Sequence, residues 1–287
     1  MNRVTLLDGA VGTSLWAKSD GDRSPVWQYN ITKQDIVKEL LGEYIDAGSE
    51  MLLSNTFGIN RPIAERFSYK VSDVVKNAME LLNEVAGSRK TLSGEKVQTI
   101  FSSGPLSQML EPYGDLEEDE CFEIYDELVK AAVAEKPDYI WFQTFMDLNM
   151  MEIAVRAASQ YDVPIFCTLS FTEVGKTMFG NSPEDMVETL APYEKVKAVE
   201  LNCSVGPESG VAIIKSFHEC TELPLIFKPN AGIPITGSGG KSEIRFDAET
   251  FAKDSLPALD YGVKYIGGCC GSDPSYIKVL KEMIENG

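Results

Sequence analysis

Short apolar runs alternate with longer amphipathic stretches along the whole chain of 287 residues. Each apolar run is only a few residues long, is rich in Val, Ile, Leu or Phe, and lacks strict alternation of apolar and polar positions. This pattern is typical of strands that are buried on both faces of a parallel sheet. We therefore predict eight strands, at Val4–Leu7, Met51–Ser54, Val97–Phe101, Tyr139–Phe142, Pro164–Leu169, Ala198–Leu201, Leu225–Phe227 and Tyr265–Gly267.

The amphipathic stretches between these runs have helical spacing. Thr32 is placed to cap a helix that continues through Ile45 and that Gly48 closes, and Ser72 is placed to cap one that ends near Gly87. Eight strands alternating with eight helices predict a single-domain (β/α)8 TIM barrel over residues 1–287. An open, doubly wound sheet is the alternative, but such sheets seldom need eight equal units. The other predicted helices cover residues 117–135, 148–160, 183–190, 209–220, 248–261 and 274–284.

Polar residues and glycines gather directly after the predicted strands. In a barrel of this kind the active site forms at the carboxyl ends of the strands and in the loops that follow them. The sequence therefore predicts a site whose walls are these strand ends, where glycines allow close approach of the backbone. The segments concerned are Asp8–Thr13, Ser54–Gly58, Ser102–Pro105, Gln143–Asp147, Asn202–Ser204, Lys228–Gly232 and Gly268–Gly271.

The net charge and the start of the chain indicate which partners are disfavoured and where the protein is expected to be located. The chain has 44 acidic and 26 basic side chains, a formal net charge of −18 at pH 7. This acidity disfavours nucleic acids and anionic membrane surfaces as partners. Asp8 interrupts the apolar start of the chain too early for a signal peptide, and we expect a cytoplasmic protein. A single histidine, His218, excludes mechanisms that need two imidazoles.

Three of the six cysteines follow predicted strands. Cys203 follows the sixth strand, and the pair Cys269 and Cys270 follows the eighth, with only one strand between them in a closed barrel. Three thiolates at one point suit a zinc ion with its fourth position open, and the flanking glycines permit both paired sulfurs to face it. The alternative is that Cys203 fills the core and the pair is incidental or redox-active. The remaining cysteines, Cys121, Cys167 and Cys220, fit a filling role in helices and in the fifth strand.

Several motifs together resemble the homocysteine S-methyltransferase family, with the homocysteine-binding barrel of cobalamin-dependent methionine synthase as the nearest likeness. The resemblance covers nearly the whole chain, and no single motif would suffice. The motifs are Leu7–Thr13, Asn55–Gly58, Gly104–Pro105, Asn202–Pro207, Pro229–Gly232 and Gly267–Gly271.

The resemblance implies a zinc-dependent thiol S-methyltransferase that converts homocysteine to methionine. It implies that Cys203, Cys269 and Cys270 bind Zn²⁺ and that Asp8 holds the substrate's amino group. It also implies that backbone amides of the first loop, near Gly9, receive the substrate's carboxylate. Thr13, Asn202 and Asn230 are expected to shape the pocket. The residue types agree with this chemistry, because a thiolate-rich zinc site keeps a bound sulfur electron-rich for in-line attack on a methyl group.

One residue departs from the family pattern. After the fourth strand the family usually has a glutamate, whereas this chain has Gln143. Glutamine accepts a hydrogen bond from an ammonium group but does not neutralise it, and charge-assisted bonds are roughly twice as strong. Three interpretations are open. Asp8 binds the substrate's amino group alone, Asp147 helps it to do so, or the thiol substrate is not homocysteine.

The sequence leaves the methyl donor open among S-methylmethionine, S-adenosylmethionine and a methylcorrinoid protein supplied in trans. Two rival functions remain. One is a phosphosubstrate lyase or isomerase that uses a lysine such as Lys228, and the other is a metal-binding subunit that works only when docked on a corrinoid protein. The glycine-rich segment Thr236–Lys241 follows the seventh strand, where barrels often bind phosphate, but it lacks the spacing of a phosphate-binding loop, and we expect a surface loop there.

Overall fold

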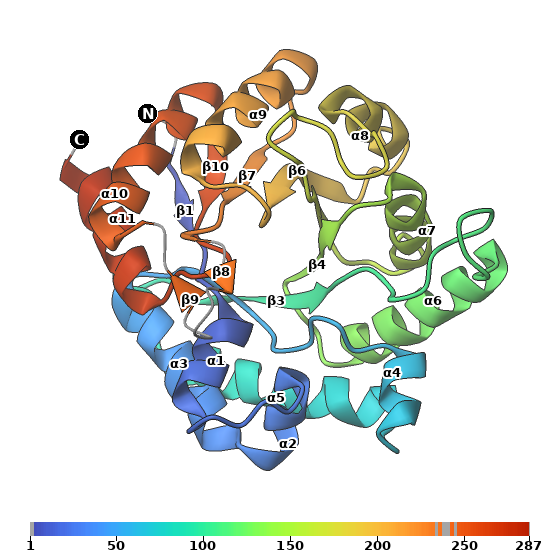
Figure 1. Ribbon diagram of the computed structural model, residues 1–287. Helices are drawn as coiled ribbons and strands as arrows, with labels where there is room; N and C mark the ends of the chain where they lie inside the picture. Colours follow the sequence, from blue (N-terminus) through green and yellow to red (C-terminus); the bar gives the residue numbers. More distant parts are fainter. Residues whose placement is uncertain (1–2, 233–234, 237–241, 244–245, 287) are drawn as a thin grey trace.

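The computed structural model describes residues 3–232, 235–236, 242–243 and 246–286, and within them eight parallel strands form one sheet (Figure 1). The sheet order β1, β10, β7, β6, β5, β4, β3, β2 follows the chain around a barrel. At the seam between β1 and β2 the backbone N–H of Glu50 donates to the carbonyl of Leu6 at 2.8 Å. The predicted (β/α)8 barrel is confirmed. Its strands are β1 (Thr5–Leu6), β2 (Met51–Leu53), β3 (Gln98–Ser103), β4 (Tyr139–Phe145), β5 (Ile165–Leu169), β6 (Val196–Asn202), β7 (Leu225–Lys228) and β10 (Val263–Ile266).

Helices alternate with the strands and cover the outside of the sheet (Figure 1). Their buried faces pack on the outer side of the barrel in one large apolar cluster. The helices are α1 (Val11–Lys18), η1 (Val26–Gln28), α2 (Tyr29–Thr32), α3 (Gln34–Ala47), α4 (Arg61–Arg66), α5 (Val71–Ser88), α6 (Glu118–Ala134), α7 (Leu148–Ala158), α8 (Pro183–Leu190), α9 (Pro207–Cys220), α10 (Ala248–Ser255), η2 (Leu256–Tyr261) and α11 (Pro274–Asn286).

Two predicted helix starts are wrong. Thr32 ends the short helix α2, where its hydroxyl donates to the carbonyl of Gln28 at 3.1 Å, and α3 begins after Lys33 instead. Ser72 lies inside α5, which begins after Lys70. Neither cap residue of the real helices uses its side chain. The preference for hydroxyl caps therefore placed these helices correctly but missed their first residues.

Two helix ends have clear backbone causes. Gly48 closes α3 as predicted, with φ of +110° and its N–H donated to the carbonyl of Ile45. The stretch 248–261 is not one helix but two, because Pro257 cannot continue the hydrogen-bond ladder of α10 and the chain tightens into η2.

The barrel interior changes from apolar to polar along the strands. Its apolar part is a cluster of nine buried residues, one or two from each strand. Two residues further along most strands, the inward side chains are polar, and they lie toward the carboxyl ends of the strands. The apolar cluster is Leu7, Met51, Leu53, Ile100, Trp141, Phe166, Ala198, Ile226 and Tyr265, and the polar residues two positions further along are Ser102, Gln143, Thr168, Glu200 and Lys228.

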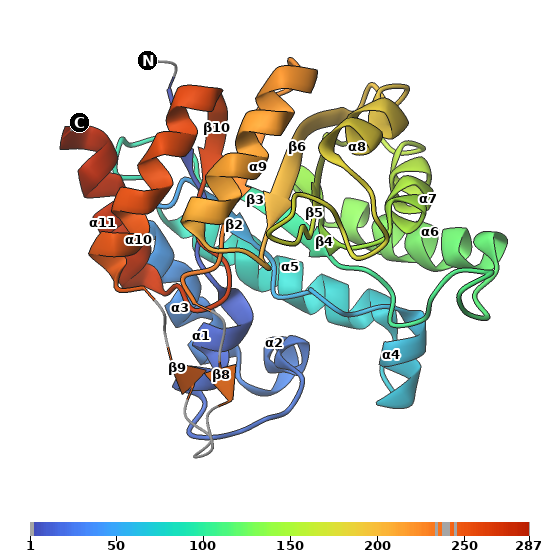
Figure 2. The same cartoon turned by 45° about the horizontal axis from the view of Figure 1, so that its top comes forward.

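In the chain, β7 and α10 are separated by a small antiparallel pair of strands, β8 (Ile235–Thr236) and β9 (Ser242–Glu243). It projects from the end of the barrel where α1 lies (Figure 2). The predicted surface loop at Thr236–Lys241 begins here, and residues 237–241 lie outside the described residues. Within the described part of the chain, no helix has both the length and the apolar character needed to cross a bilayer.

Candidate active site and metal centre

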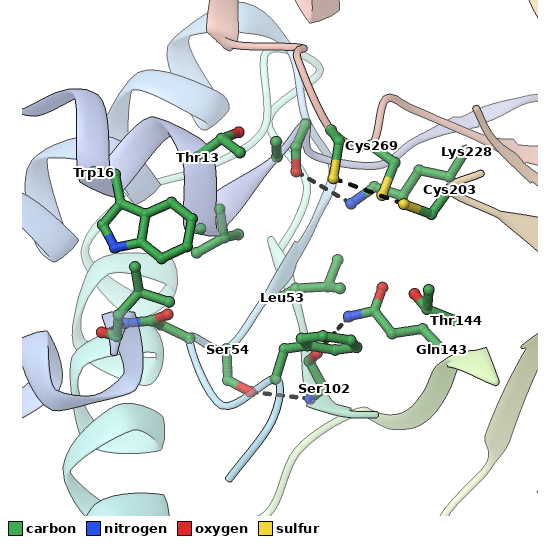
Figure 3. A pocket seen from close by; sticks show the side chains of 18 residues that line it. Thr13, Trp16, Leu53, Ser54, Ser102, Gln143, Thr144, Cys203, Lys228 and Cys269 are labelled. Carbon is green, nitrogen blue, oxygen red and sulfur yellow. Dashed lines mark hydrogen bonds between the residues drawn. The ribbon is translucent and has the colours of Figure 1, made fainter. Parts of the chain in front are cut away.

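A cavity of about 270 Å³ opens at the carboxyl ends of the strands, at the end of the barrel predicted to hold the site. Its walls come from the loop after β1, the first turns of α1, and the ends of β2, β3, β4, β6, β7 and β10 (Figure 3). Most of the lining is apolar. The lining residues are Gly9, Ala10, Val11, Gly12, Thr13, Trp16, Val26, Leu53, Ser54, Asn55, Phe57, Ser102, Gln143, Thr144, Cys203, Lys228, Cys269 and Cys270.

Three cysteine side chains converge on one side of this cavity. The Sγ atoms of Cys203, Cys269 and Cys270 all lie within 4.8 Å of one another, and those of Cys203 and Cys270 are 3.6 Å apart. The end of β7 positions both segments, because the carbonyl of Lys228 accepts from the N–H of Cys203 (3.1 Å) and that of Pro229 from the N–H of Cys269 (2.8 Å). The structure thus brings the three predicted zinc ligands to one point.

The local backbone allows two adjacent cysteines to face the same point. After β10 the chain turns instead of continuing as a strand, and the N–H of Ser272 donates to the carbonyl of Cys269 at 3.1 Å. Gly267 has no room for a side chain, since a Cβ atom there would lie 2.6 Å from the carbonyl oxygen of Asp8, and Gly271 takes a φ of +85°. Cys203 itself has a φ of +64°, which is uncommon for a residue with a side chain.

Crowding and burial raise the pKa of all three thiols. Hydrogen bonds between the sulfurs have the largest influence, in directions that differ between pairs, and burial and repulsion between neighbouring thiolates raise every value. The pKa of Cys203 rises to about 11, and those of Cys269 and Cys270 rise to about 12. A bound cation would favour the thiolate form of all three. Three soft donors that leave one tetrahedral position free fit a zinc ion.

Asp8 does not line the cavity. Its side chain is fully buried, and both carboxylate oxygens have donors: Lys228 Nζ on Oδ1 at 2.8 Å and the N–H of Leu53 on Oδ2 at 2.8 Å. Lys228 also donates to the carbonyl of Gly9 at 3.1 Å, and its ammonium lies 5.8 Å from the centre of the Trp141 ring. The floor of the cavity therefore contains a buried ion pair between β7 and the end of β1.

A hydrogen-bond network fixes Gln143 on the cavity wall. Its Nε2 donates to Ser102 Oγ, and its Oε1 accepts from Asn202 Nδ2 at 3.3 Å. Asn202 is buried behind the wall, where Nδ2 also donates to Thr144 Oγ1 (2.7 Å) and Oδ1 accepts from Thr168 Oγ1 (2.6 Å). Asn202 therefore contacts the residues of the wall and is not itself part of it.

Of the other predicted pocket residues, two line the cavity and one is buried beside it. Gly9 and Thr13 line the cavity. Asn230 does not: it is buried beside the site, its N–H donates to the carbonyl of Val205 at 2.9 Å, and its Oδ1 has no partner among the described residues. Lys228, which the sequence predicts as catalytic only in the rival lyase or isomerase reaction, also lines the cavity. Its signal in the sequence is a cation directly after a short apolar run.

Three comparisons with known proteins address the identity of the chain. The methionine synthase of Mycobacterium leprae (strain TN) is 24% identical over 295 residues, which are 96% of this chain but 24% of that protein. The methionine synthase of Mycobacterium tuberculosis is 24% identical over 299 residues, 99% of this chain and 25% of that protein. This chain thus spans about a quarter of the length of these relatives. Homocysteine S-methyltransferase 1 of Zea mays is 25% identical over 312 residues, covering 98% of this chain and 94% of that protein.

The solved structures agree with the fold. The metallated form of the homocysteine methyltransferase MmuM from Escherichia coli superimposes with a TM-score of 0.84 at 19% identity, covering 98% of this chain and 96% of that one. Its apo form gives a TM-score of 0.77 at 20% identity. The model of the family described as homocysteine S-methyltransferase matches residues 5–284. This chain therefore belongs to the homocysteine S-methyltransferase family.

Proposed function

We propose that this protein is a zinc-dependent S-methyltransferase that methylates the sulfur of a small thiol, homocysteine or a close relative of it. The observation that carries the proposal is the cluster of Cys203, Cys269 and Cys270 on the wall of a largely apolar cavity. Membership of the homocysteine S-methyltransferase family and the similarity to Homocysteine S-methyltransferase 1 of Zea mays support it.

In this proposal the three cysteines hold Zn²⁺, which lowers the pKa of an acceptor thiol so that it binds as a nucleophilic thiolate. The protein supplies the remaining requirements. Gly267 and Gly271 let the paired cysteines face one point, and the strand ends keep the cluster fixed. The apolar lining around Trp16, Val26 and Leu53 keeps water from the reacting atoms, which disfavours hydrolysis of the donor. Thr13 and the first turn of α1 offer hydrogen-bond donors to an acceptor's carboxylate.

The same proposal includes a cytoplasmic location and a donor that reaches the cavity from outside the barrel. A cytoplasmic protein keeps its thiols reduced, and all six cysteines are free. The donor candidates are S-methylmethionine, S-adenosylmethionine and a methylcorrinoid protein in trans.

The test is a matrix of these three donors against small thiols, using zinc-loaded protein and mass detection of the methylated thioether. Cys203→Ser, Cys269→Ser and Cys270→Ser are each expected to lower bound zinc and to reduce activity by more than about 100-fold, because even residues behind a metal's ligands are worth 10–100-fold. Cys220→Ser, at the end of α9 and outside the cluster, is the matched control and is expected to retain metal and activity.

Full methylation activity in Cys269→Ser would contradict the proposal and favour the lyase or isomerase reading, in which Lys228 acts without a metal. Thiol methylation only in the presence of a corrinoid protein would identify that protein as the donor. Methylation by the isolated chain with a small-molecule donor would exclude the reading as a docked, non-catalytic subunit.

A further inference from the structure

The charges on the cavity wall are unusual for a site that would hold an amino acid. Among its lining residues the only charged side chain besides the thiols is Lys228, and none is an aspartate or glutamate. An ammonium group that leaves water for such a cavity loses hydration and finds no carboxylate there to pair with, and a buried charge without a hydrogen-bonded partner is costly. A carboxylate has the backbone N–H groups of the first turn of α1 on the same wall, and an uncharged chain loses no charge hydration.

The nearest acid behind the wall is already neutralised. Asp8 is fully buried, and its two oxygens accept from Lys228 Nζ and from the N–H of Leu53, each at 2.8 Å. For Asp8 to bind a substrate ammonium, it would have to give up the Lys228 cation and leave that cation in the same small space. The ion pair therefore acts against a cationic ligand.

The second position that faces the cavity is an amide. Gln143 has its Nε2 committed to Ser102 and its Oε1 shared with Asn202 Nδ2. Figure 3 shows Gln143 and Thr144 bordering the same cavity as Cys203 and Cys269. A glutamate at this position would give the wall its one carboxylate, so residue 143 is the position where a substrate ammonium could gain a direct ionic partner.

We infer that the preferred acceptor is a small thiol that lacks an α-ammonium group, of the ω-mercaptocarboxylate class, and not homocysteine itself. The inference rests on the proposed function and specifies its substrate class. The N-terminus of α1 at Val11–Thr13, which has no side-chain cap and lies on the wall, matches the acceptor's carboxylate, and the cysteine cluster matches its sulfur.

With a sulfonium donor the transfer balances simply. The acceptor's sulfur forms an S–CH3 bond while the donor's CH3–S⁺ bond breaks. The bonding pair stays on the donor's sulfur, which becomes a neutral thioether, and the acceptor's thiol proton is released to solvent. No oxidant or reductant is involved.

The experiment compares homocysteine with 4-mercaptobutyrate, which has the same carbon chain, thiol and carboxylate but no amino group. We expect kcat/KM for 4-mercaptobutyrate to exceed that for homocysteine by about tenfold or more. Calorimetric titration of zinc-loaded protein with each thiol gives the same ratio in Kd without any donor. Equal or better binding and use of homocysteine would overturn the inference and leave the proposed function intact, whereas failure to methylate any thiol would overturn the proposed function.

Gln143→Glu tests the cause. It adds one anion to the wall with little change of shape, and we expect the ratio of kcat/KM values to move toward homocysteine by about tenfold or more. The matched control is Gln160→Glu, the same substitution at an exposed residue after α7, near the amino ends of the strands. The control is expected to leave the ratio unchanged, and an unchanged ratio in Gln143→Glu would contradict the assignment of selectivity to this wall.

Discussion

Asp8 and Glu200 are both fully buried acids inside the barrel, and the protein provides for them in opposite ways. Asp8, directly after β1, has the ammonium of Lys228 on one oxygen and the N–H of Leu53 on the other. Glu200, in the middle of β6, has no hydrogen-bond partner on either oxygen among the described residues. Burial raises the pKa of the Glu200 carboxyl well above its usual range, which favours the neutral acid.

The difference shows that burial alone does not decide the state of an acid in this barrel. Glu200 pairs in register with Thr168 on one side and Ile226 on the other, so its strand neighbours offer one hydroxyl and one hydrocarbon chain. Its backbone φ of +147° is also one that side chains rarely adopt. Asp8, in contrast, is bound directly by the ammonium of Lys228 at the end of β7. The protein thus holds an ion pair beside the site, whereas the burial of Glu200 favours its neutral form.

The largest expected effect comes from removing the cation of Asp8. Lys228→Met would leave a buried carboxylate with only the N–H of Leu53, and breaking a buried pair by deleting one partner typically costs about 3–5 kcal/mol. Urea unfolding at pH 7 measures this loss. The double variant Asp8→Asn with Lys228→Met keeps an acceptor for Leu53 and removes both charges, so it is expected to recover more than half of the loss. A Lys228→Met protein as stable as the parent would mean that Asp8 does not depend on this pair.

The opposite case is Glu200→Gln, which removes a titratable group whose carboxyl oxygens have no hydrogen-bond partner among the described residues. Because the folded-state pKa of Glu200 is raised, its contribution to stability is complete below the unfolded pKa and is lost as the pH rises toward the folded one. The variant and the parent should therefore be similar in stability near pH 4. Above that, the variant should gain about 1.4 kcal/mol per pH unit relative to the parent, until the folded pKa is reached.

Unfolding free energies of both proteins from pH 4 to pH 8 measure this difference directly. Titration of the other carboxyls affects both proteins equally and cancels in the comparison. Parallel curves would show that Glu200 ionises in the folded protein as freely as in the unfolded chain.

The sequence predicted the parts of the fold that depend on one segment at a time. Buried strands appear as apolar runs, and the convergence of Cys203 with Cys269 and Cys270 follows from barrel order, because only β7 lies between β6 and β10. Helix starts were less predictable. Thr32 has the side chain of a good cap, but its hydroxyl binds the carbonyl of Gln28 within its own short helix.

The parts that could not be predicted depend on which of several possible partners a polar group takes. Asp8 and Lys228 are 220 positions apart, and each follows a strand, but nothing in the sequence says that they pair. The sequence predicts that Gln143 faces the site, but it does not predict that Lys228 neutralises Asp8. Glu200 did leave a signal: it is an acid within the run Ala198–Leu201, whose pattern predicts burial on both faces.

The smallest expected effect is that of Thr168→Val, beside Glu200 in the barrel. It shows how the loss of a hydrogen bond differs from the loss of a titratable group in its effect on the free energy of unfolding. Thr168 Oγ1 accepts from Trp141 Nε1 at 2.8 Å and donates to Asn202 Oδ1 at 2.6 Å, so its hydroxyl is already committed to these neighbours. Thr168→Val keeps the shape and leaves the buried indole N–H without an acceptor, which costs about 1–3 kcal/mol. Neither threonine nor tryptophan titrates between pH 4 and pH 8, so this loss should be constant where that of Glu200→Gln varies. A loss that changes with pH would show that the Thr168 hydroxyl stabilises the acid of Glu200, and that the two buried acids differ less than their contacts indicate.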